Sequence, residues 1–227
     1  SASSDPWDSF ADTIHFSIPS CVGDLASLIP PNARVLEVGC GYGRISRDLR
    51  DHGFTDVTGY DSSPSMIERG HREHPDLTLR LNFGADLPEP DGGADAVVCC
   101  AVLTCIPDVM ARERVLGEIE RVLRPGGVVH VVEFAEGGSR SYDASGRFMS
   151  RFGIEMVHFS RQRLLTELGR FQDVGIREFD CRSVSGNPEK ALVFQGKKRA
   201  NQALEPTRML VTDPAAQAPR QAPVRLI

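Results

Sequence analysis

The sequence predicts an α/β fold with a doubly wound, mostly parallel seven-stranded sheet that ends in an antiparallel C-terminal hairpin. Two observations predict it. Between Val35 and Phe134, short apolar runs typical of buried strands alternate with helical segments, and such repeats form a parallel sheet with helices on both faces. Beyond residue 170, two further strand-like runs are separated only by a short turn, which pairs strands antiparallel.

Five strands are expected in the parallel part of the sheet. They are residues 35–38, 57–60, 77–81, 94–101 and 128–134. Helices are expected over residues 19–29 and 44–52 and after the N-cap residues Ser63, Asp108 and Ser160. Ser and Asp side chains suit this position because they accept hydrogen bonds from N–H groups of the first turn.

The C-terminal part of the chain changes character. Residues 137–153 are rich in Gly, Ser and Arg, which favours a solvated polar loop. The alternative is a substrate lid that favours an anion, formed by Arg140, Arg147 and Arg151 with Tyr142, Phe148 and Phe152. Residues 174–181 and 191–195 are the expected hairpin strands. Residues 200–227 contain Pro and Ala without aromatic residues, a composition typical of a disordered tail.

Length and composition fit one globular domain. The chain has 227 residues, of which 41% are hydrophobic and 25% charged, an ordinary balance for a protein that buries one core. The formal net charge is −5, which gives no electrostatic signature of DNA or RNA binding. No apolar run reaches the roughly 18 residues of a transmembrane helix. We therefore expect neither a nucleic-acid nor a membrane partner.

The cysteines predict a reducing environment. They are Cys21, Cys40, Cys99, Cys100, Cys105 and Cys181. No two form a Cys-x-x-Cys pair, and none stands at zinc-finger spacing to a histidine. We therefore expect free, mostly buried thiols and no metal site. The acidic N-terminal segment shows no signal-peptide pattern, and together these features favour a cytoplasmic protein.

The main functional signal is a glycine-rich turn after the first expected strand. Residues 35–44 read V-L-E-V-G-C-G-Y-G-R, and glycines are required where φ is positive or a ligand contacts the backbone. Asp61 ends the second strand about 20 residues later, where nucleotide-binding α/β folds place an acid that binds a ribose diol. The alternatives are a strand-to-helix turn without a ligand and an Asp61 that only caps the helix at Ser63.

The turn departs from the dinucleotide fingerprint, because Arg44 stands where that fingerprint has its third glycine. It resembles instead the class I S-adenosylmethionine-dependent methyltransferases. The resemblance covers about residues 7–197 and continues through Leu87-Pro88, Ile106-Pro107-Asp108 and the V-L-R-P-G-G of residues 122–127. It implies a Rossmann-like methyltransferase domain over residues 1–199, with an N-terminal lid segment at about 1–30 and S-adenosylmethionine as cofactor.

The resemblance also implies which residues bind the cofactor. They are Trp7, Glu37, Gly39, Gly41, Gly43, Asp61, Ser62, Met66, Asp86, Cys100 and Ala101. The three glycines would bring the backbone close to the methionine and ribose parts, and Glu37 would hold the amino group. Asp61 would bind the ribose diol.

The remaining members of this set would surround the adenine and the sulfonium. Ser62 and Met66 would flank the adenine, Cys100 and Ala101 would lie below the sulfonium, and Trp7 would cover the cofactor. Many relatives carry an Asp that contacts the adenine amino group, but Phe83 stands at that position here. The contact would then fall to Asn82, to Asp86, or to the backbone at residues 84–85.

Methyl transfer from a sulfonium asks for orientation, desolvation and, for a protonated nucleophile, a base. The candidate bases are Glu133, at the end of the fifth strand, and His158, before the helix at Ser160. The alternatives are a structural carboxylate for Glu133 and a packing imidazole for His158.

Together these observations predict an enzyme that transfers a methyl group from S-adenosylmethionine to a small-molecule acceptor. One alternative is an NAD(P)-dependent oxidoreductase, which the missing third glycine and the antiparallel last strands disfavour. The other is a catalytically silent cofactor-binding or scaffold protein of this fold. The acceptor, the methylated atom and the oligomeric state are left open by the sequence.

Overall fold

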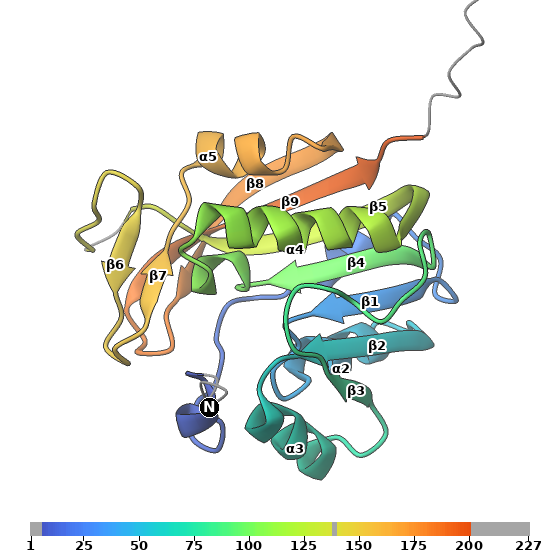
Figure 1. The fold of residues 1–227 in the computed structure, drawn as a ribbon, viewed down its shortest axis with the longest axis horizontal. Helices are drawn as coiled ribbons and strands as arrows, with labels where there is room; N and C mark the ends of the chain where they lie inside the picture. The colour runs from blue at the N-terminus through green and yellow to red at the C-terminus, as the bar shows by residue number, and fades with distance from the viewer. Residues whose placement is uncertain (1–5, 138–139, 201–227) are drawn as a thin grey trace, which may run out of the picture.

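A seven-stranded sheet forms the centre of the computed structural model, which describes residues 6–137 and 140–200. Its strand order is β3-β2-β1-β4-β5-β9-β8 (Figure 1). The bounds are β1 (Arg34–Val38), β2 (Asp56–Asp61), β3 (Thr78–Leu81), β4 (Ala94–Cys100), β5 (Leu123–Ala135), β8 (Phe171–Arg182) and β9 (Pro188–Lys198). The first five strands pair in parallel, and β9 pairs antiparallel with both β5 and β8. The predicted fold class is confirmed.

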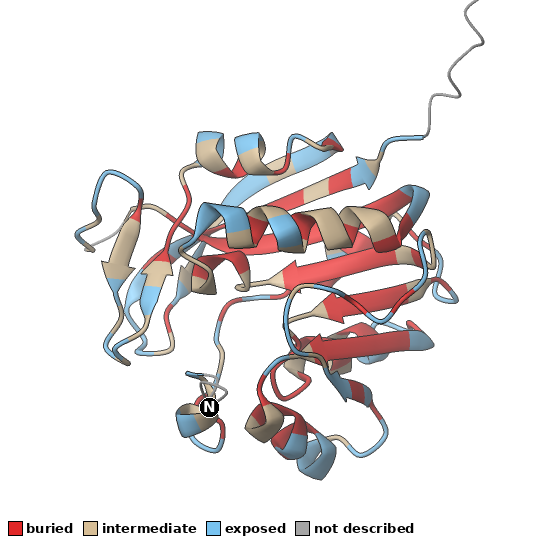
Figure 2. Ribbon diagram, viewed as in Figure 1, coloured by how far each residue is buried: buried red, intermediate tan, exposed pale blue. Residues whose placement is uncertain are grey.

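Helices cover both faces of the sheet. They are α1 (Val22–Ala26), α2 (Arg44–Asp51), α3 (Pro64–Glu73), α4 (Val109–Val122) and α5 (Arg161–Glu167), with 3-10 turns η1 (Asp8–Phe10) and η2 (Leu103–Cys105). Leu36 and Val97 pack on the face with α4 and α5, and their neighbours Val35 and Ala96 on the face with α1 and α2, because adjacent strand residues face opposite sides. Both faces are therefore apolar, and the central strands are buried (Figure 2).

The three predicted N-caps are confirmed. Ser63, Asp108 and Ser160 each accept a hydrogen bond from a backbone N–H three residues later. The helix predicted over residues 19–29 is shorter, because Cys21 at its N-cap takes a left-handed φ of 54° and cannot continue a right-handed helix. The fifth strand begins at Leu123 rather than at residue 128, with an irregular register against β4.

The solvated loop predicted for residues 137–153 is wrong in part. Arg147–Met149 (β6) pairs antiparallel with Glu155–Val157 (β7), and this hairpin lies beyond the carboxyl ends of β1 and β4, at the left of Figure 1. Strands of three residues are too short to show a clear alternation in sequence. The predicted tail, apart from residue 200, lies outside the described residues.

The N-terminal segment is attached to α3. Arg69 donates from Nη1 to the carbonyls of Ala11 (2.8 Å) and Ile14 (2.6 Å), and Ser63 donates from Oγ to Asp8. Ala11 and Ile14 are buried against Tyr42 and Met66. These contacts hold the segment beside the carboxyl ends of the parallel strands.

The ion pair between Arg112 and Glu167 connects α4 to α5, and its contribution to stability can be tested. Arg112 is buried, donates from Nε and Nη2 to Glu167 (both 2.7 Å), and donates from Nη1 to the carbonyls of Ile106 and Pro107. Arg112→Ala leaves a buried carboxylate without its partner, which costs about 3–5 kcal/mol. We expect that loss of unfolding free energy in urea denaturation.

The matched control is Arg72→Ala, which removes an exposed ion pair with Asp12 and should cost less than about 1 kcal/mol. Equal losses in the two variants would show that the Arg112 pair does not join the helices.

Candidate functional site

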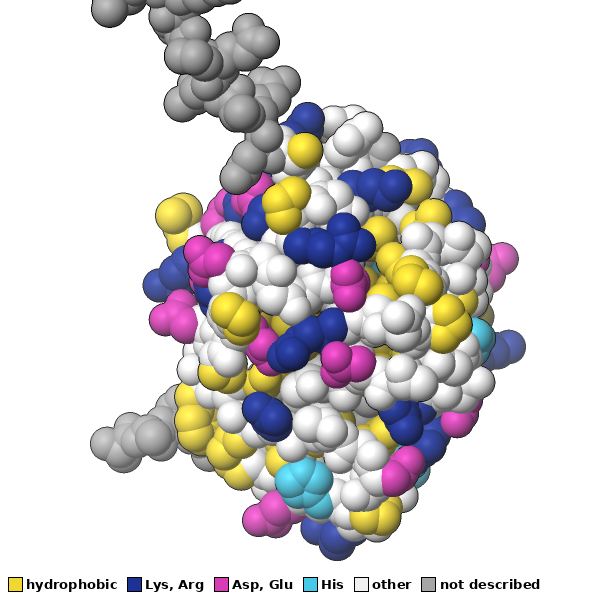
Figure 3. Space-filling view, turned by 90° about the vertical axis from the view of Figure 1, so that its right-hand side faces the viewer, with side chains coloured by type: hydrophobic (Ala, Val, Ile, Leu, Met, Phe, Trp, Pro, Cys, Tyr) yellow, Lys and Arg dark blue, Asp and Glu magenta, His cyan; other side chains and the backbone are white. Residues whose placement is uncertain are grey.

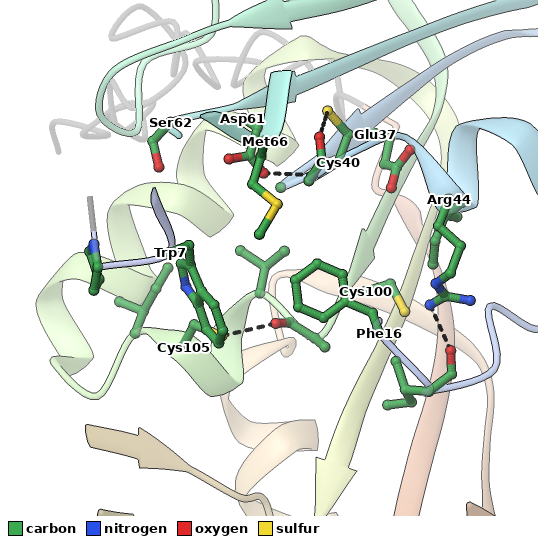
Figure 4. Close-up of a pocket in the computed structure, with 18 residues that line it drawn as sticks. Trp7, Phe16, Glu37, Cys40, Arg44, Asp61, Ser62, Met66, Cys100 and Cys105 are labelled. Atoms are coloured by element: carbon green, nitrogen blue, oxygen red, sulfur yellow. Dashed lines mark hydrogen bonds between the residues drawn. The ribbon is translucent and has the colours of Figure 1, made fainter. Parts of the chain in front are cut away.

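A cavity of about 290 Å³ lies beyond the carboxyl ends of β1 and β4. The strand order changes direction between these two strands, which is where open α/β sheets bind ligands. The loops after β1, β2 and β4 line it, and Trp7 and Phe16 of the N-terminal segment complete it (Figure 4). The fold thus gathers residues from four separate parts of the chain.

Two of the three glycines of the turn lie at this cavity. Gly39 (φ 70°) approaches Val102 so closely that a Cβ would lie 2.3 Å from its Cγ2, and Gly41 (φ 53°) donates from its N–H to Oδ2 of Asp61 at 2.7 Å. Gly43 (φ 87°) is the N-cap of α2, packs against Leu79 and is absent from the cavity lining. The positive φ of the turn therefore explains why residue 43 is a glycine.

Asp61 connects two of the loops. Its Oδ2 accepts from Gly41, and its Oδ1 accepts from the N–H of Ser63 at 2.9 Å. The helix cap itself is made by Ser63, whose Oγ accepts from Met66. A carboxylate has about four acceptor positions, so these backbone contacts are compatible with acceptance from a ribose diol.

Glu37 and Arg44 lie at one wall of the cavity. Glu37 is buried and accepts from Ser46 Oγ; burial raises its pKa from 4.5 to about 8, against the opposing effects of Ser46 and Arg44. Arg44 donates from Nη2 to the carbonyl of Ile18 (2.7 Å), and its buried Nε has no partner among the described residues. Sequence reasoning gave Arg44 no binding role, and its place directly after the glycine turn was the available signal.

The other predicted residues lie around the same space. Ser62, Met66, Cys100, Ala101 and Trp7 all line the cavity, and Figure 4 shows Met66 directed toward its centre. Ala101 takes a left-handed φ of 55°, unusual for a residue with a Cβ.

Phe16 was missed by sequence reasoning. Its ring stacks on Tyr42 with centroids 5.6 Å apart and meets Trp7 edge-on at 5.9 Å. It comes from the N-terminal segment, where no periodic pattern marks it.

A smaller cavity of about 140 Å³ adjoins the first and shares Gly39, Asp61 and Ser62 with it. Asn82 and residues 84–85 line this smaller cavity. Asp86 does not: it lines a separate pocket that includes Phe83. Of the alternatives left open for the adenine contact, the geometry favours Asn82 and the adjacent backbone.

Glu133 has the contacts of a structural carboxylate. It is fully buried and accepts from the N–H groups of Val102 (3.1 Å), Leu103 (2.8 Å) and Thr104 (3.0 Å). Burial raises its pKa to about 8, and the three N–H groups act in the opposite direction. Glu133 lines none of the cavities described in this section, which disfavours its predicted role as a base.

His158 lies in a third cavity, of about 170 Å³. Its Nδ1 is 2.9 Å from Tyr142 Oη, and its ring stacks on Phe134 with centroids 5.2 Å apart. Burial and the charge of Arg140 lower its pKa to about 3, so the imidazole is neutral near pH 7. This is the environment of a packed imidazole at a cavity wall.

Much of the segment predicted to be a solvated loop lines the third cavity. Arg140, Phe148, Arg151 and Phe152 line it. Arg147 does not, and donates instead to the carbonyl of Pro107 (2.7 Å). The segment is therefore a cavity wall, which sequence composition did not reveal because the burial depends on the β8–β9 turn opposite.

The distribution of surface charge and the length of the helices are relevant to nucleic-acid and membrane partners. On the face in Figure 3, basic and acidic side chains are intermingled rather than gathered into one basic surface. Among the described residues, no helix has both the length and the apolar character needed to cross a bilayer.

The buried Glu37 predicts a pH dependence of stability. Its folded pKa lies above the unfolded value, so between about pH 4.5 and 8 unfolding releases a proton and stability falls as pH rises. Glu37→Gln removes this contribution and keeps an acceptor for Ser46. We expect the urea midpoint of the variant to fall less than that of the parent between about pH 5 and 8.

The control is Glu118→Gln. Arg121 lowers the pKa of the Glu118 carboxyl, so its stabilising effect is constant above the unfolded pKa and the slope between about pH 5 and 8 should not change. A parent slope retained in Glu37→Gln would mean that Glu37 is ionised in the folded protein.

The part of the chain that is similar to known proteins includes the loops after β1, β2 and β4, which line the first cavity. Residues 36–131 match the family model described as "Methyltransferase domain". A demethylmenaquinone methyltransferase of Beutenbergia cavernae is 39% identical over 105 residues, covering 46% of this chain and 42% of that protein. A 2-methyl-6-phytyl-1,4-hydroquinone methyltransferase of Synechocystis is 37% identical over 120 residues, covering 49% and 35%. The chain thus spans less than half the length of these curated relatives.

Solved structures share the fold. An S-adenosylmethionine-dependent methyltransferase of Methanosarcina mazei superposes with a TM-score of 0.73 at 24% identity, over 78% of this chain and 97% of that one. One from Mesorhizobium loti gives 0.61 at 20% identity, over 83% and 100%.

Proposed function

Because the chain belongs to the class I S-adenosylmethionine-dependent methyltransferase family, we propose that it transfers a methyl group from S-adenosylmethionine to a small-molecule acceptor. The observation that carries this proposal is the cavity beyond β1 and β4, where the carboxylates of Glu37 and Asp61 lie beside the backbone of Gly39 and Gly41. The relatives named as demethylmenaquinone and hydroquinone methyltransferases support a small-molecule acceptor.

The residues present fit the chemical groups of the cofactor. Glu37 suits its ammonium group, and the unpartnered Nε of Arg44 suits its carboxylate. Asp61 suits the ribose diol, and Asn82, beside it in the smaller cavity, suits the adenine. An ammonium group beside Glu37 favours the ionised form of its carboxyl, and opposite charges inside a buried site interact more strongly than in water. Glu37 and Arg44 together would therefore orient the methionine part.

When bound, S-adenosylmethionine supplies a methyl group already activated by the sulfonium. The chain then has to orient the reactants and exclude water. Trp7, Phe16 and Met66 provide apolar walls for this purpose. The first cavity and the third one are adjacent, since Ala101 and Cys105 line both. We propose that catalysis relies on this positioning rather than on a strong base.

A cytoplasmic location is also part of the proposal. The structure has free thiols at all six cysteines, which supports a reducing compartment.

The choice of cofactor is tested by thermal shift with S-adenosylhomocysteine, NADH and NADPH. A ligand that binds only the folded state stabilises it by RT ln(1 + [L]/Kd) and so raises the melting temperature. We expect S-adenosylhomocysteine to raise it and the two nicotinamide cofactors to leave it unchanged. Stabilisation by NADH or NADPH alone would favour the oxidoreductase. Formation of S-adenosylhomocysteine with an acceptor panel then distinguishes the enzyme from a silent binding protein.

Asp61→Ala tests the ribose contact. A hydrogen bond to a charged group contributes about 1.5–3 kcal/mol, and about 1.4 kcal/mol corresponds to one decade of affinity. We therefore expect calorimetric titration to show S-adenosylhomocysteine binding at least about tenfold weaker. Asp61→Asn should lose less, since its amide oxygen still accepts.

Asp108→Ala is the control for the loss of a helix cap. It removes the N-cap of α4, which lies outside the cavities described above, at a cost of about 1 kcal/mol of stability and should leave affinity within about threefold of the parent. An Asp61→Ala affinity equally close to the parent would exclude the ribose role.

A further inference from the structure

The third cavity is built by segments that lie far apart in sequence. The N-terminal segment, the β6–β7 hairpin and the β8–β9 turn all contribute walls. Four residues line both this cavity and the first one, so the two are adjacent: Trp7, Phe16, Ala101 and Cys105. A molecule in the third cavity would lie next to a ligand in the first.

Glu189 gives this cavity an unsatisfied acceptor. Its side chain is 2% exposed, and its Oε1 accepts from Arg140 Nε at 2.6 Å. Its Oε2 is buried and has no hydrogen-bond partner among the described residues. An unpartnered buried carboxylate oxygen is costly. Because Glu189 lines the cavity, a donor placed there can satisfy this oxygen.

The walls of the cavity favour a flat ring. Aromatic side chains from three segments line it, among them Trp7, Phe134, Phe148 and Phe152. The volume is about 170 Å³, and an apolar protein cavity of about 150 Å³ holds benzene. One substituted aromatic ring therefore matches the space.

The charges disfavour an ammonium group in the cavity and favour a neutral donor beside Glu189. Arg140 and Arg151 face the cavity with Glu189, and His158 is neutral because burial lowers its pKa. Two cations and one anion disfavour an ammonium group. An anionic ring would place its charge against the unpartnered oxygen of Glu189, while the Nε of Arg140 is already engaged.

We propose that the third cavity is the acceptor site and that Glu189, held by Arg140, selects a neutral aromatic acceptor whose hydroxyl donates to Glu189 Oε2. The proposal rests on the proposed function only in naming this molecule the methyl acceptor. Recognition by Glu189 is a property of the cavity itself and can be measured without turnover.

The test uses matched single-ring probes and the fluorescence of Trp7. The chain has one tryptophan, and it lines both this cavity and the first one, so its emission reports binding of a probe at either, and the Glu189 variant below assigns the binding to the third cavity. We expect p-cresol, which has a hydroxyl donor, to bind about tenfold or more tightly than 4-methylanisole, which has none. Equal affinity, or tighter binding of p-toluate than of p-cresol, in the unmodified protein overturns the proposal without any variant.

Glu189→Gln tests whether Glu189 causes the preference for p-cresol over 4-methylanisole. The amide of the variant replaces one acceptor oxygen by a donor, so the ratio of the two affinities should fall by about tenfold. Glu178→Gln is the matched control, because Glu178 is an exposed acid on the same hairpin, paired with Lys190 outside the cavity. A preference retained in Glu189→Gln overturns the proposal.

S-adenosylhomocysteine titration of the same samples separates the two hypotheses. Unchanged affinity in Glu189→Gln shows that the variant is folded and that its effect is confined to the third cavity, as the proposal requires. Failure of the parent to bind S-adenosylhomocysteine, with the p-cresol preference intact, would count against the proposed function and leave recognition by Glu189 supported.

Discussion

Glu133 holds together the region on which both main cavities depend. Its carboxylate accepts from three successive N–H groups after β4, which sets the path of residues 102–104. Val102 on that path approaches Gly39 too closely for any Cβ, and Thr104 donates from Oγ1 to the carbonyl of Val157 in β7. One buried acid thereby connects the glycine turn, the end of β4 and the wall of the third cavity.

Three buried acids lie at or near the site. Glu37 and Glu133 both have pKa values raised by burial, and one oxygen of Glu189 has no partner within the described part of the chain. Such groups cost stability unless they are paired, and perturbed or incompletely satisfied acids are concentrated at functional sites. A cationic ligand would suit Glu37, and a hydrogen-bond donor would supply a partner for the Oε2 of Glu189.

The segment that matches known methyltransferases covers most of the first cavity and leaves out much of the third one. The matched segment, residues 36–131, includes Glu37, the glycine turn, Asp61 and the end of β4. Trp7, Phe148 and Glu189 of the third cavity lie outside it. Similarity to the family therefore predicts the part of the site that suits the cofactor, whereas the chemistry of the acceptor has to be read from the arrangement of these other segments.

The sequence by itself determined the sheet, its antiparallel end and the cluster at the carboxyl ends of β1, β2 and β4. Apolar periodicity is local, and parallel strands bring their carboxyl ends to one edge, so Gly39, Asp61 and Ala101 could be placed together in advance. Only the tertiary structure showed that Glu133 accepts from three backbone N–H groups and that Asn82 rather than Asp86 lies at the smaller cavity. It also showed that one oxygen of Glu189 has no hydrogen-bond partner among the described residues. Those outcomes depend on contacts between segments distant in sequence and on burial, which no local pattern encodes.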